Sequence, residues 1–407
     1  WPIAGTAVYM TSYPRTDEDR DWEDILPVRQ WLYQTPEQIL IKASNGASDF
    51  GNKFGQPLIT GSVLTFEHQE NGERYGYDKV IMLAGGVGYG TKRDCLKGTP
   101  QKGNKVVVVG GDNYRIGLGG GSVSSVDTGR YSSGIELNAV QRANPEMQKR
   151  ANNLVRALCE EDVNPVVSIH DHGSAGHVNC LSELVEECGG LIDMSKLPIG
   201  DKTLSSKEII ANESQERMGL LIQEEHIEHV RKIAERERAP MYVVGETTGD
   251  AHFAFQQADG VRPFDLDVAQ MFGHSPKTYM RDNTVERKYE DVTYDEAKLN
   301  EYVARVLRLE AVACKDWLTN KVDRSVTGKV ARQQCQGEIQ LPLSDCGVVA
   351  LDYRGKAGIA TAIGHAPQAG LADPAAGSVL SVAESLTNIV WAPLAEGLDS
   401  VSPVSYT

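Results

Sequence analysis

Two polar stretches of this chain carry side chains that could bind a phosphorylated ligand and a divalent cation. In the first, Ser168–His177, the apolar strand-like run Val166–Ile169 leads into a polar cluster that includes Asp171, and a small-residue turn then opens a helix. A carboxylate delivered beside a helix N-terminus is suited to a phosphate with its Mg²⁺. The second stretch has four hydrogen-bonding side chains in a row, Asn212 to Gln215, just before the strand-like Met218–Ile222. Together the two stretches predict a binding site.

Three histidines in the first stretch, His170, His172 and His177, offer a different kind of site. Strand alternation places His170 and His172 on one face and Asp171 on the other. Zinc would need two or three converging histidines with a fourth position open, and no HExxH motif occurs. Asp171 holding Mg²⁺ near a phosphate is therefore favoured, and a zinc hydrolase is kept as an alternative.

A second group of oxygen ligands lies near the C-terminal end. Glu384 and Asn388 are four residues apart in a helical pattern, so their side chains share one face. Asp345 stands at the start of a strand-like run. The three side chains supply all-oxygen ligation suited to Mg²⁺. Spacing alone favours the simpler interpretation, an N-cap aspartate and two surface residues, and both interpretations stay open at this point.

The elements that must position these residues read as a layered α/β domain over about residues 105–275. Strands and helices alternate there, each with its own signal, such as Asn144 and Pro145 at a helix start. The predicted strands are Val106–Val109, Asn164–Ile169, Met218–Ile222 and Met241–Val244, and the helices include one from Pro145, Cys180–Cys188 and Glu224–Arg238.

The flanking parts are less regular, with short strands and Gly-rich turns at the N-terminal side and longer helices at the C-terminal side. Lys97–Lys105 is a polar linker and a candidate domain boundary. The other predictions are strands over Thr6–Met10, Pro57–Phe66, Lys79–Leu83 and Cys346–Asp352, a polar loop over Ser44–Asn52, and helices over Glu296–Leu318 and Ala376–Val390.

Composition excludes several classes of protein. The net charge is −15, from 41 basic and 56 acidic residues, and no Lys/Arg-rich stripe interrupts it, which argues against nucleic-acid binding. No window approaches the ~18 apolar residues of a membrane span, and no signal peptide is visible. The seven cysteines show no CxxC spacing, so reduced thiols in a cytoplasmic protein are expected.

Beyond spacing, long motifs in this chain resemble the phosphoribosylformylglycinamidine synthase family, in its long single-chain form. The resemblance covers essentially the whole chain. It is carried by LAGGVGYG (83–90), NYRIGLGGGSVSS (113–125), AVQRANPEM (139–147), IHDHGSAGHVNCLSELVEECGG (169–190), IIANESQERMGLL (209–221), RERAPMYVVGE (236–246), DRSVTGKVARQQ (323–334) and AESLTNIVWAPL (383–394).

The fold that this resemblance implies is a mixture of α/β and α+β, as in the aminoimidazole ribonucleotide synthetase-like superfamily. A layered α/β B domain is flanked by parts of two ferredoxin-like A domains. The implied domains are residues 1–102, the C-terminal part of the first A domain, 103–280, the first B domain, and 281–407, the start of the second A domain.

The family makes formylglycinamidine ribonucleotide from formylglycinamide ribonucleotide, ATP and glutamine in purine biosynthesis. The resemblance implies roles for nine residues, with Mg²⁺ and ATP or ADP as cofactors. Substrate contacts are expected at Gln141, Glu213, Ser214 and Gln215. A Mg²⁺ contact is expected at Asp171, and a contact with an auxiliary nucleotide at Ser344. Asp345, Glu384 and Asn388 match three of the four ligands of that nucleotide's Mg²⁺, which reverses the preference from spacing.

The family's catalytic His-Asn-His-Pro segment and Gly-rich ATP loop would lie before Trp1. Its fourth Mg²⁺ ligand and its glutaminase domain would lie after Thr407. The expected partners are therefore formylglycinamide ribonucleotide, the remaining synthase segments and a glutaminase domain, and the isolated chain is expected to lack turnover. The alternative is a non-catalytic nucleotide-binding scaffold stabilised by ADP and Mg²⁺.

Overall fold

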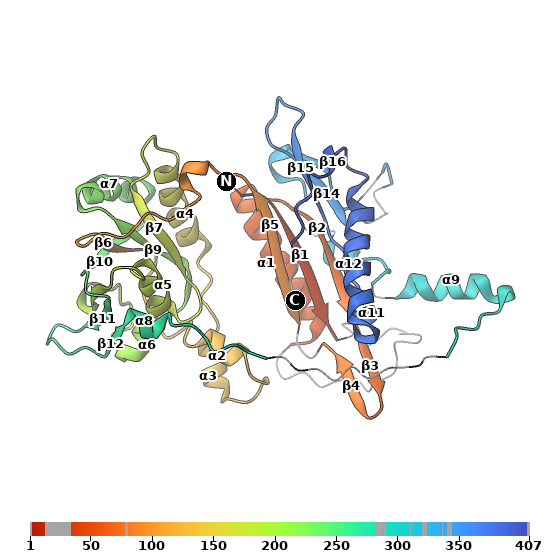
Figure 1. Ribbon diagram of the computed structural model, residues 1–407, viewed down its shortest axis with the longest axis horizontal. Coiled ribbons are helices and arrows are strands. Elements are labelled where there is room, and N and C mark those ends of the chain that lie inside the picture. Colours follow the sequence, from red (N-terminus) through yellow and green to blue (C-terminus); the bar gives the residue numbers. More distant parts are fainter. Residues whose placement is uncertain are drawn as a thin grey trace. The chain divides into compact units, whose positions relative to one another are not determined.

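The computed structural model describes two compact units, which Figure 1 draws as ribbons. Unit 1 combines Trp1–Tyr89 with Asp282–Thr407, and unit 2 is Gly90–Arg281. The described residues are 2–12, 34–77, 80–279, 281, 288, 290–309, 311–319, 324–335, 337–339 and 344–404.

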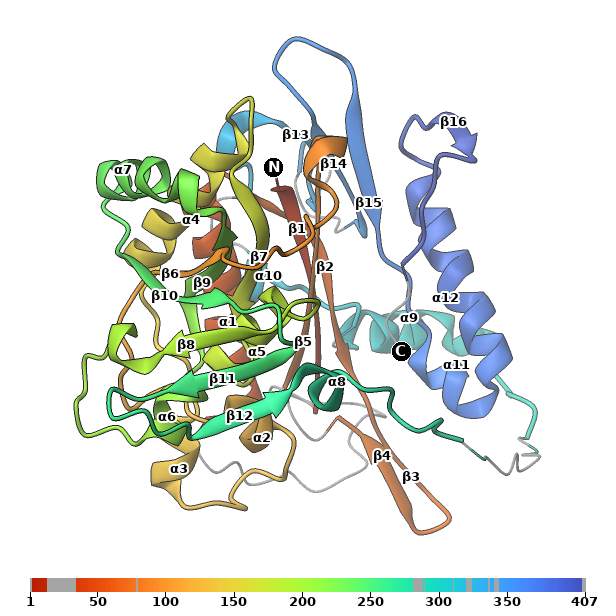
Figure 2. The same cartoon turned by 60° about the vertical axis from the view of Figure 1, so that its left-hand side comes forward.

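Unit 2 is built on a seven-stranded sheet in the order β12-β11-β8-β10-β6-β9-β7. Most neighbours are antiparallel, and the pair β11–β8 is parallel. Figure 2 displays the strands from β10 through β8 and β11 to β12 in this order. The strands are β6 (Lys105–Val109), β7 (Val166–His172), β8 (Gly190–Asp193), β9 (Ser214–Ile222), β10 (Met241–Thr247), β11 (His252–Gln256) and β12 (Phe264–Asp267).

Helices cover both faces of this sheet, so the side chains of β6 are buried on both sides. Val106 and Val108 pack with α5 and α6, whereas Val107 and Val109 pack with α4 and α7. The run of valines is thus a central strand, as its sequence predicts. The helices are α2 (Gly120–Ser124), α3 (Ser133–Asn138), α4 (Pro145–Cys159), α5 (Gly176–Leu184), α6 (Ser206–Ile210), α7 (Ile227–Glu237) and α8 (Val268–Met271).

Helix α4 begins as predicted, with Pro145 in its first turn and the Asn144 side chain accepting a hydrogen bond from the Met147 N–H. Two other elements of unit 2 differ from prediction. Helix α5 begins at Gly176 and ends at Leu184, four residues before the predicted end. Strand β9 begins at Ser214 rather than Met218, because Ser214 pairs with the last residue of β7.

Unit 1 has a three-stranded sheet, β2-β1-β5, and a second one, β13-β14-β15. Ile59 of β2 and Val349 of β14 share one buried cluster, so the early and late parts of the sequence pack together. The elements are β1 (Pro2–Thr11), α1 (Pro36–Phe54), β2 (Leu58–Thr65), β3 (Glu67–Glu70), β4 (Glu73–Gly76), β5 (Ile81–Gly88), α9 (Leu299–Arg308), α10 (Asp316–Thr319), β13 (Val330–Arg332), β14 (Cys346–Ala350), β15 (Gly358–Ala362), α11 (Pro367–Ala372), α12 (Pro374–Ile389) and β16 (Ala395–Leu398).

The polar loop predicted over Ser44–Asn52 is wrong, because these residues continue helix α1. Thr35 and Gln38 form a reciprocal capping box at its start. Leu40, Ser44 and Ser48 recur at four-residue intervals and are buried. Small polar side chains therefore form the packed face of a helix, which hydrophobic periodicity does not detect.

The single helix predicted over Glu296–Leu318 is also wrong. A 3₁₀ turn over Glu296–Lys298 leads into α9, and the segment over Asp316–Thr319 forms a separate short helix, α10. None of the residues of α9 is buried, whereas Leu318 is buried in a cluster with Leu40. Packing of Leu318 thus sets the direction of α10 independently of α9.

The compact units and the predicted domains divide the chain differently, so the boundaries near residues 102 and 280 stay predictions.

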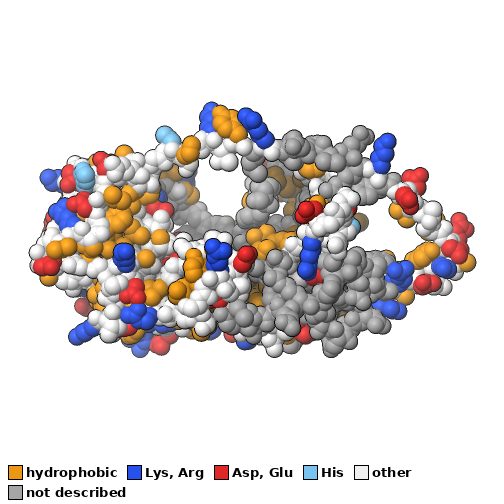
Figure 3. Space-filling model, turned by 90° about the horizontal axis from the view of Figure 1, so that it is seen from below, with side chains coloured by type: hydrophobic (Ala, Val, Ile, Leu, Met, Phe, Trp, Pro, Cys, Tyr) orange, Lys and Arg blue, Asp and Glu red, His pale blue; other side chains and the backbone are white. Residues whose placement is uncertain are grey.

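On the face drawn in Figure 3, basic and acidic side chains are interspersed over the coloured part. No described helix combines the length and apolar character needed to cross a bilayer. All seven cysteines are free, and Cys180, Cys335 and Cys346 are buried.

Candidate functional site

The Glu213 carboxylate is the centre of a hydrogen-bonded cluster in unit 2. It lies just before β9 and is only 4% exposed. Its Oε1 accepts from the backbone N–H groups of Gly121 and Ala175, each at 3.3 Å, and its Oε2 accepts from Gln141 Nε2 at 3.1 Å. The donors come from α2, from the residue before α5 and from the loop before α4. Two of the predicted substrate residues, Gln141 and Glu213, are therefore in direct contact.

A bulge in β9 separates the three residues of the predicted triplet. Asp171 pairs with Met218, yet the next residue, His172, pairs with Ser214, so Gln215 to Arg217 have no counterpart on β7. Such a bulge re-aims side chains. Ser214 is buried and its hydroxyl has no hydrogen-bond partner among the described residues, whereas Gln215 is exposed. Gln215 is thus the triplet residue that is open to a ligand.

Asp171 is exposed near the end of β7. Its Oδ1 accepts from the Gly173 N–H at 2.8 Å. A Cβ at position 173 would lie 2.6 Å from that oxygen, so a larger residue there would displace the Asp171 carboxylate. Because the side chain is exposed, Asp171 could act as a single cation ligand.

Beneath this surface, Arg217 organises a buried polar network that sequence reasoning missed. Its Nη2 donates to the Asn212 carbonyl at 3.0 Å and also to Asn212 Oδ1, and its Nη1 donates to Asn113 Oδ1. Asn212 in turn donates to the carbonyls of Tyr114 and Ile116, at 2.9 and 2.8 Å. Burial lowers the pKa of Arg217 to about 10, which still leaves it charged at neutral pH.

An ion pair between Arg142 and Glu216 lies at the same bulge. Arg142 donates through Nε to Glu216 Oε1 at 3.0 Å, and its guanidinium lies 4.7 Å from the Tyr114 ring centroid. Glu216 is fully buried, and its Oε2 has no partner among the described residues. The sequence contains a signal for this pair, because Glu216 and Arg217 place two charges directly before the apolar run Met218–Ile222.

The histidines do not form a zinc site. His170 pairs with Glu183 of α5 at 2.7 Å, whereas His172 Nε2 and His177 Nδ1 lie 2.9 Å apart. His170 and His172 both contact α5, as strand alternation predicts. Burial and the Arg217 charge hold the pKa values of His172 and His177 well below their usual range. Within the described ranges, no three His, Cys, Asp or Glu side chains are grouped so as to hold a metal.

In unit 1, Asp345, Glu384 and Asn388 are brought together around the end of β15. The Ile363 N–H donates to the Asp345 carbonyl at 3.0 Å, and Asn388 Nδ2 donates to the Ile363 carbonyl at 2.9 Å. Glu384 Oε2 accepts from the His365 N–H at 2.7 Å. A strand end thus links Asp345 with Glu384 and Asn388, which follow it by 39 and 43 positions in the sequence.

These residues fit part of a Mg²⁺ site. Burial raises the pKa of Asp345, and the nearby Glu384 charge raises it further, while His365 lowers it. Two carboxylates that repel one another, together with an amide oxygen, would be stabilised by a divalent cation. Ser344, the predicted nucleotide contact, is half-buried, and its hydroxyl accepts from the Cys346 N–H at 3.3 Å.

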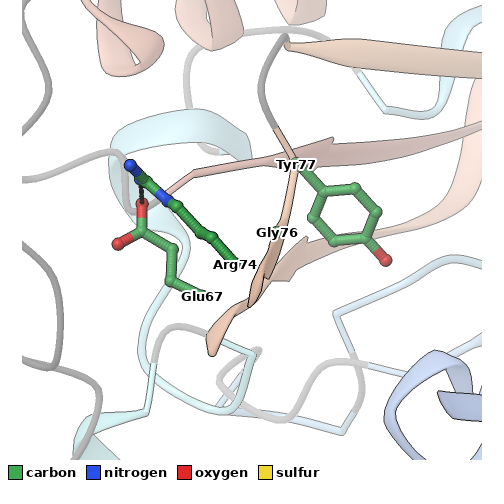
Figure 4. A pocket seen from close by; sticks show the side chains of 4 residues that line it. All are labelled: Glu67, Arg74, Gly76 and Tyr77. Atoms are coloured by element: carbon green, nitrogen blue, oxygen red, sulfur yellow. Dashed lines mark ion pairs between the residues drawn. The ribbon is translucent and has the colours of Figure 1, made fainter. Parts of the chain in front are cut away.

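A pocket elsewhere in unit 1, shown in Figure 4, contains none of the predicted residues. It has a volume of about 250 Å³ and is lined by Glu67, Arg74, Gly76 and Tyr77. Arg74 is directed to Glu67, at 3.8 Å, and away from Tyr77. Ligand pockets are usually larger, roughly 300–1,000 Å³, and here the cation is already paired. We therefore place the candidate site at the residues described above.

Comparison with known proteins agrees with the fold and with the motifs. Residues 101–257 match the family described as AIR synthase related protein, C-terminal domain, and residues 314–404 match the FGAR-AT PurM_N-like domain. The structure is also similar to Thermotoga maritima PurL complexed with FGAR, with a TM-score of 0.62 and 18% identity over 96% of this chain and 55% of that one. At this identity the likeness shows the fold, which is the synthetase-like superfamily fold expected from the motifs.

Two curated relatives are both named phosphoribosylformylglycinamidine synthase. Phosphoribosylformylglycinamidine synthase of Dictyostelium discoideum is 41% identical over 89% of this chain and 28% of its own length. That of Homo sapiens is 38% identical over 96% of this chain and 31% of its own length. The chain therefore spans less than a third of the length of these two relatives. Within that span it belongs to the phosphoribosylformylglycinamidine synthase family.

Proposed function

We propose that the chain is part of an ATP-dependent synthetase that converts formylglycinamide ribonucleotide, ATP and glutamine-derived ammonia to formylglycinamidine ribonucleotide, ADP and phosphate. Its contribution is to bind substrate and Mg²⁺–nucleotide, and other segments complete the enzyme and supply the ammonia. The observation that carries the proposal is the contact of Gln141 with Glu213 beside the exposed Gln215. A cytoplasmic location remains part of this proposal.

The names of similar structures support the choice of ligands. Besides the complex with FGAR, Thermotoga maritima PurL structures of the same fold are complexed with ATP and with ADP. In this chain the polar surface at Asp171 and Gln215 suits a phosphorylated amide substrate. The surface at Ser344, Asp345, Glu384 and Asn388 suits an auxiliary nucleotide with its Mg²⁺.

The chemistry of the proposed reaction is activation of an amide oxygen by phosphoryl transfer, followed by displacement of phosphate by ammonia. Mg²⁺, when bound, neutralises the charge on the phosphoryl group. Gln141 and Gln215 would orient the substrate, and the fixed Glu213 would hold that part of the site rigid, since catalysis of this kind depends on positioning. Asp171 would hold one metal ion. No general base is assigned to this chain.

A chimera tests the proposal. The 407 residues would replace the matching part of the Dictyostelium relative, and amidine formation would be measured with ammonia and ATP. We expect activity in the chimera and at least a tenfold lower kcat/KM for the substrate in Gln215→Ala. The matched control is Gln223→Ala, an exposed glutamine just beyond the other end of β9. An inactive chimera, or equal effects of the two substitutions, would count against the proposal.

A second candidate function is a nucleotide-binding scaffold without a direct role in turnover. The specific observation in its favour is the convergence of Asp345, Glu384 and Asn388 within unit 1. ADP with Mg²⁺ is then expected to raise the melting temperature of the chain, and the increase should disappear in Glu384→Ala. A chimera that loses stability but keeps full kcat when Glu384 is replaced would favour the scaffold role for this site.

A further inference from the structure

The buried histidines His172 and His177 belong to a continuous hydrogen-bonded line that begins at Arg217. Arg217 Nη1 lies 2.8 Å from His177 Nε2, and His177 Nδ1 lies 2.9 Å from His172 Nε2. All three side chains are inaccessible to solvent. The line crosses from β9 through α5 to β7, where His172 directly follows Asp171.

A hydrogen bond from Arg217 to His177 sets one direction of donors and acceptors along the line. A guanidinium has donors and no acceptor, so His177 Nε2 must accept from Arg217. His177 then carries its proton on Nδ1 and donates to His172 Nε2. His172 in turn carries its proton on Nδ1. Asn113 Oδ1 accepts from Arg217 Nη1 and also lies 3.1 Å from His177 Nε2. A proton on His177 Nε2 that donated to Asn113 would reverse the line, so the tautomers of the two histidines distinguish the two directions.

The opposite end of Arg217 holds the segment that leads into the predicted substrate residues. Its Nη2 donates to both the carbonyl and the side chain of Asn212. The next residue, Glu213, donates its N–H to the Gly117 carbonyl at 2.7 Å. The position of the Glu213 backbone therefore depends on an arginine whose own direction depends on His177.

We propose that His172 and His177 are positioning residues that fix, through Arg217, the Asn212–Gln215 segment against the strand that carries Asp171. The identity of the ligand at that segment rests on the proposed function. The arrangement of the segment does not, because every hydrogen bond in the line joins residues of this chain. Neither histidine contacts substrate or metal in this account.

The first test is spectroscopic. Long-range ¹⁵N–¹H NMR of the chain at pH 7.5 distinguishes the two neutral tautomers of each imidazole, and His→Phe variants assign the signals. We expect both His172 and His177 to be neutral with the proton on Nδ1. An Nε2–H tautomer or an imidazolium at either residue would overturn the proposal.

The second test is amide hydrogen exchange at Glu213. His177→Phe keeps ring volume but removes the acceptor, and should speed exchange there at least tenfold without changing exchange in β11. His177→Gln provides both an acceptor and a donor and should restore most of the protection. His229→Phe, on the exposed side of α7, is the control.

Equal loss of protection in the Phe and Gln variants would show that ring packing, not hydrogen-bond direction, holds the segment, and would overturn the proposal. If His177→Phe does not fold, the tautomers of the unsubstituted chain and the Gln variant still decide. Both tests need no ligand, so their failure is distinct from failure of the chimera.

Discussion

Replacing Glu213 with glutamine is the most informative perturbation of the unit 2 site. The substitution keeps the shape of the side chain and removes its charge and one of its acceptors. Three donors converge on the carboxylate, the N–H groups of Gly121 and Ala175 and the amide of Gln141. A glutamine can serve the two backbone donors through Oε1, but its Nε2 then faces the Gln141 amide, donor against donor.

The expected loss follows from these contacts. Hydrogen bonds to a charged group contribute roughly 1.5–3 kcal/mol, and a buried group left without a partner costs about 1–3 kcal/mol. The three bonds are long, at 3.1 to 3.3 Å, and Gln141 is only half-buried, so it can turn its amide. We therefore expect unit 2 to lose about 2 kcal/mol of unfolding free energy.

The assay can separate the two units because all five tryptophans lie in the ranges of unit 1. Tryptophan fluorescence in urea follows unit 1, whereas circular dichroism follows both units. Glu213→Gln should shift the transition that circular dichroism reports and leave the fluorescence transition in place. Glu228→Gln, a surface glutamate paired with Arg231 on α7, is the control and should change the free energy by less than about 0.5 kcal/mol.

A loss below about 0.5 kcal/mol for Glu213→Gln would contradict this prediction. The three hydrogen bonds to the buried carboxylate would then contribute no more to stability than the contacts of a surface glutamate. A shift of the fluorescence transition would also contradict it, since no contact described for Glu213 involves unit 1.

Further predictions concern pH, the metal residues, a helix cap and turnover. The pKa values of His172 and His177 are lowered in the folded protein, so the unfolded state binds more protons at acidic pH. Unit 2 should therefore lose stability as the pH falls below about 6.5, by at most ~1.4 kcal/mol per pH unit for each histidine. Urea titrations at several pH values measure this loss. Burial raises the pKa of Asp345, so the ionised carboxylate destabilises unit 1 at a pH above the ordinary pKa of an aspartate. Asp345→Asn should therefore raise the melting temperature of unit 1 without Mg²⁺. The same substitution should abolish any increase in melting temperature that Mg²⁺ with ADP causes, as measured by fluorescence. Thr35→Ala removes the cap of α1 and should cost unit 1 about 1 kcal/mol in the same urea assay. The isolated 407 residues should give no amidine from ammonia and ATP, and robust turnover would contradict the assigned division of roles.

Much of the α/β unit could be predicted from its sequence. The valines of β6, the Asn144 cap of α4 and the charged helix α7 give strong local signals, and each forms the predicted element. The failures have a common cause, which is packing that the local pattern does not encode. Helix α1 is packed through serines, and α10 is separated from α9 by the burial of Leu318.

The motifs name the residues of the candidate site, but their sequence does not give the arrangement of these residues in space. Asp171 and Gln215 are exposed, so a ligand could reach both, and their role in binding stays a prediction. Their support comes from Arg217, Asn113 and His177, which meet only because a bulge in β9 turns Arg217 into the interior. A bulge depends on the register of two strands, and the sequence of one strand does not specify it.

The most direct test of the central claim is a calorimetric titration of formylglycinamide ribonucleotide into this chain in the presence of Mg²⁺. We expect saturable binding to one site per chain, weakened at least tenfold by Gln215→Ala and unchanged by Gln223→Ala. Binding that Gln215→Ala and Asp171→Asn both leave intact would place the substrate elsewhere and contradict the proposed site.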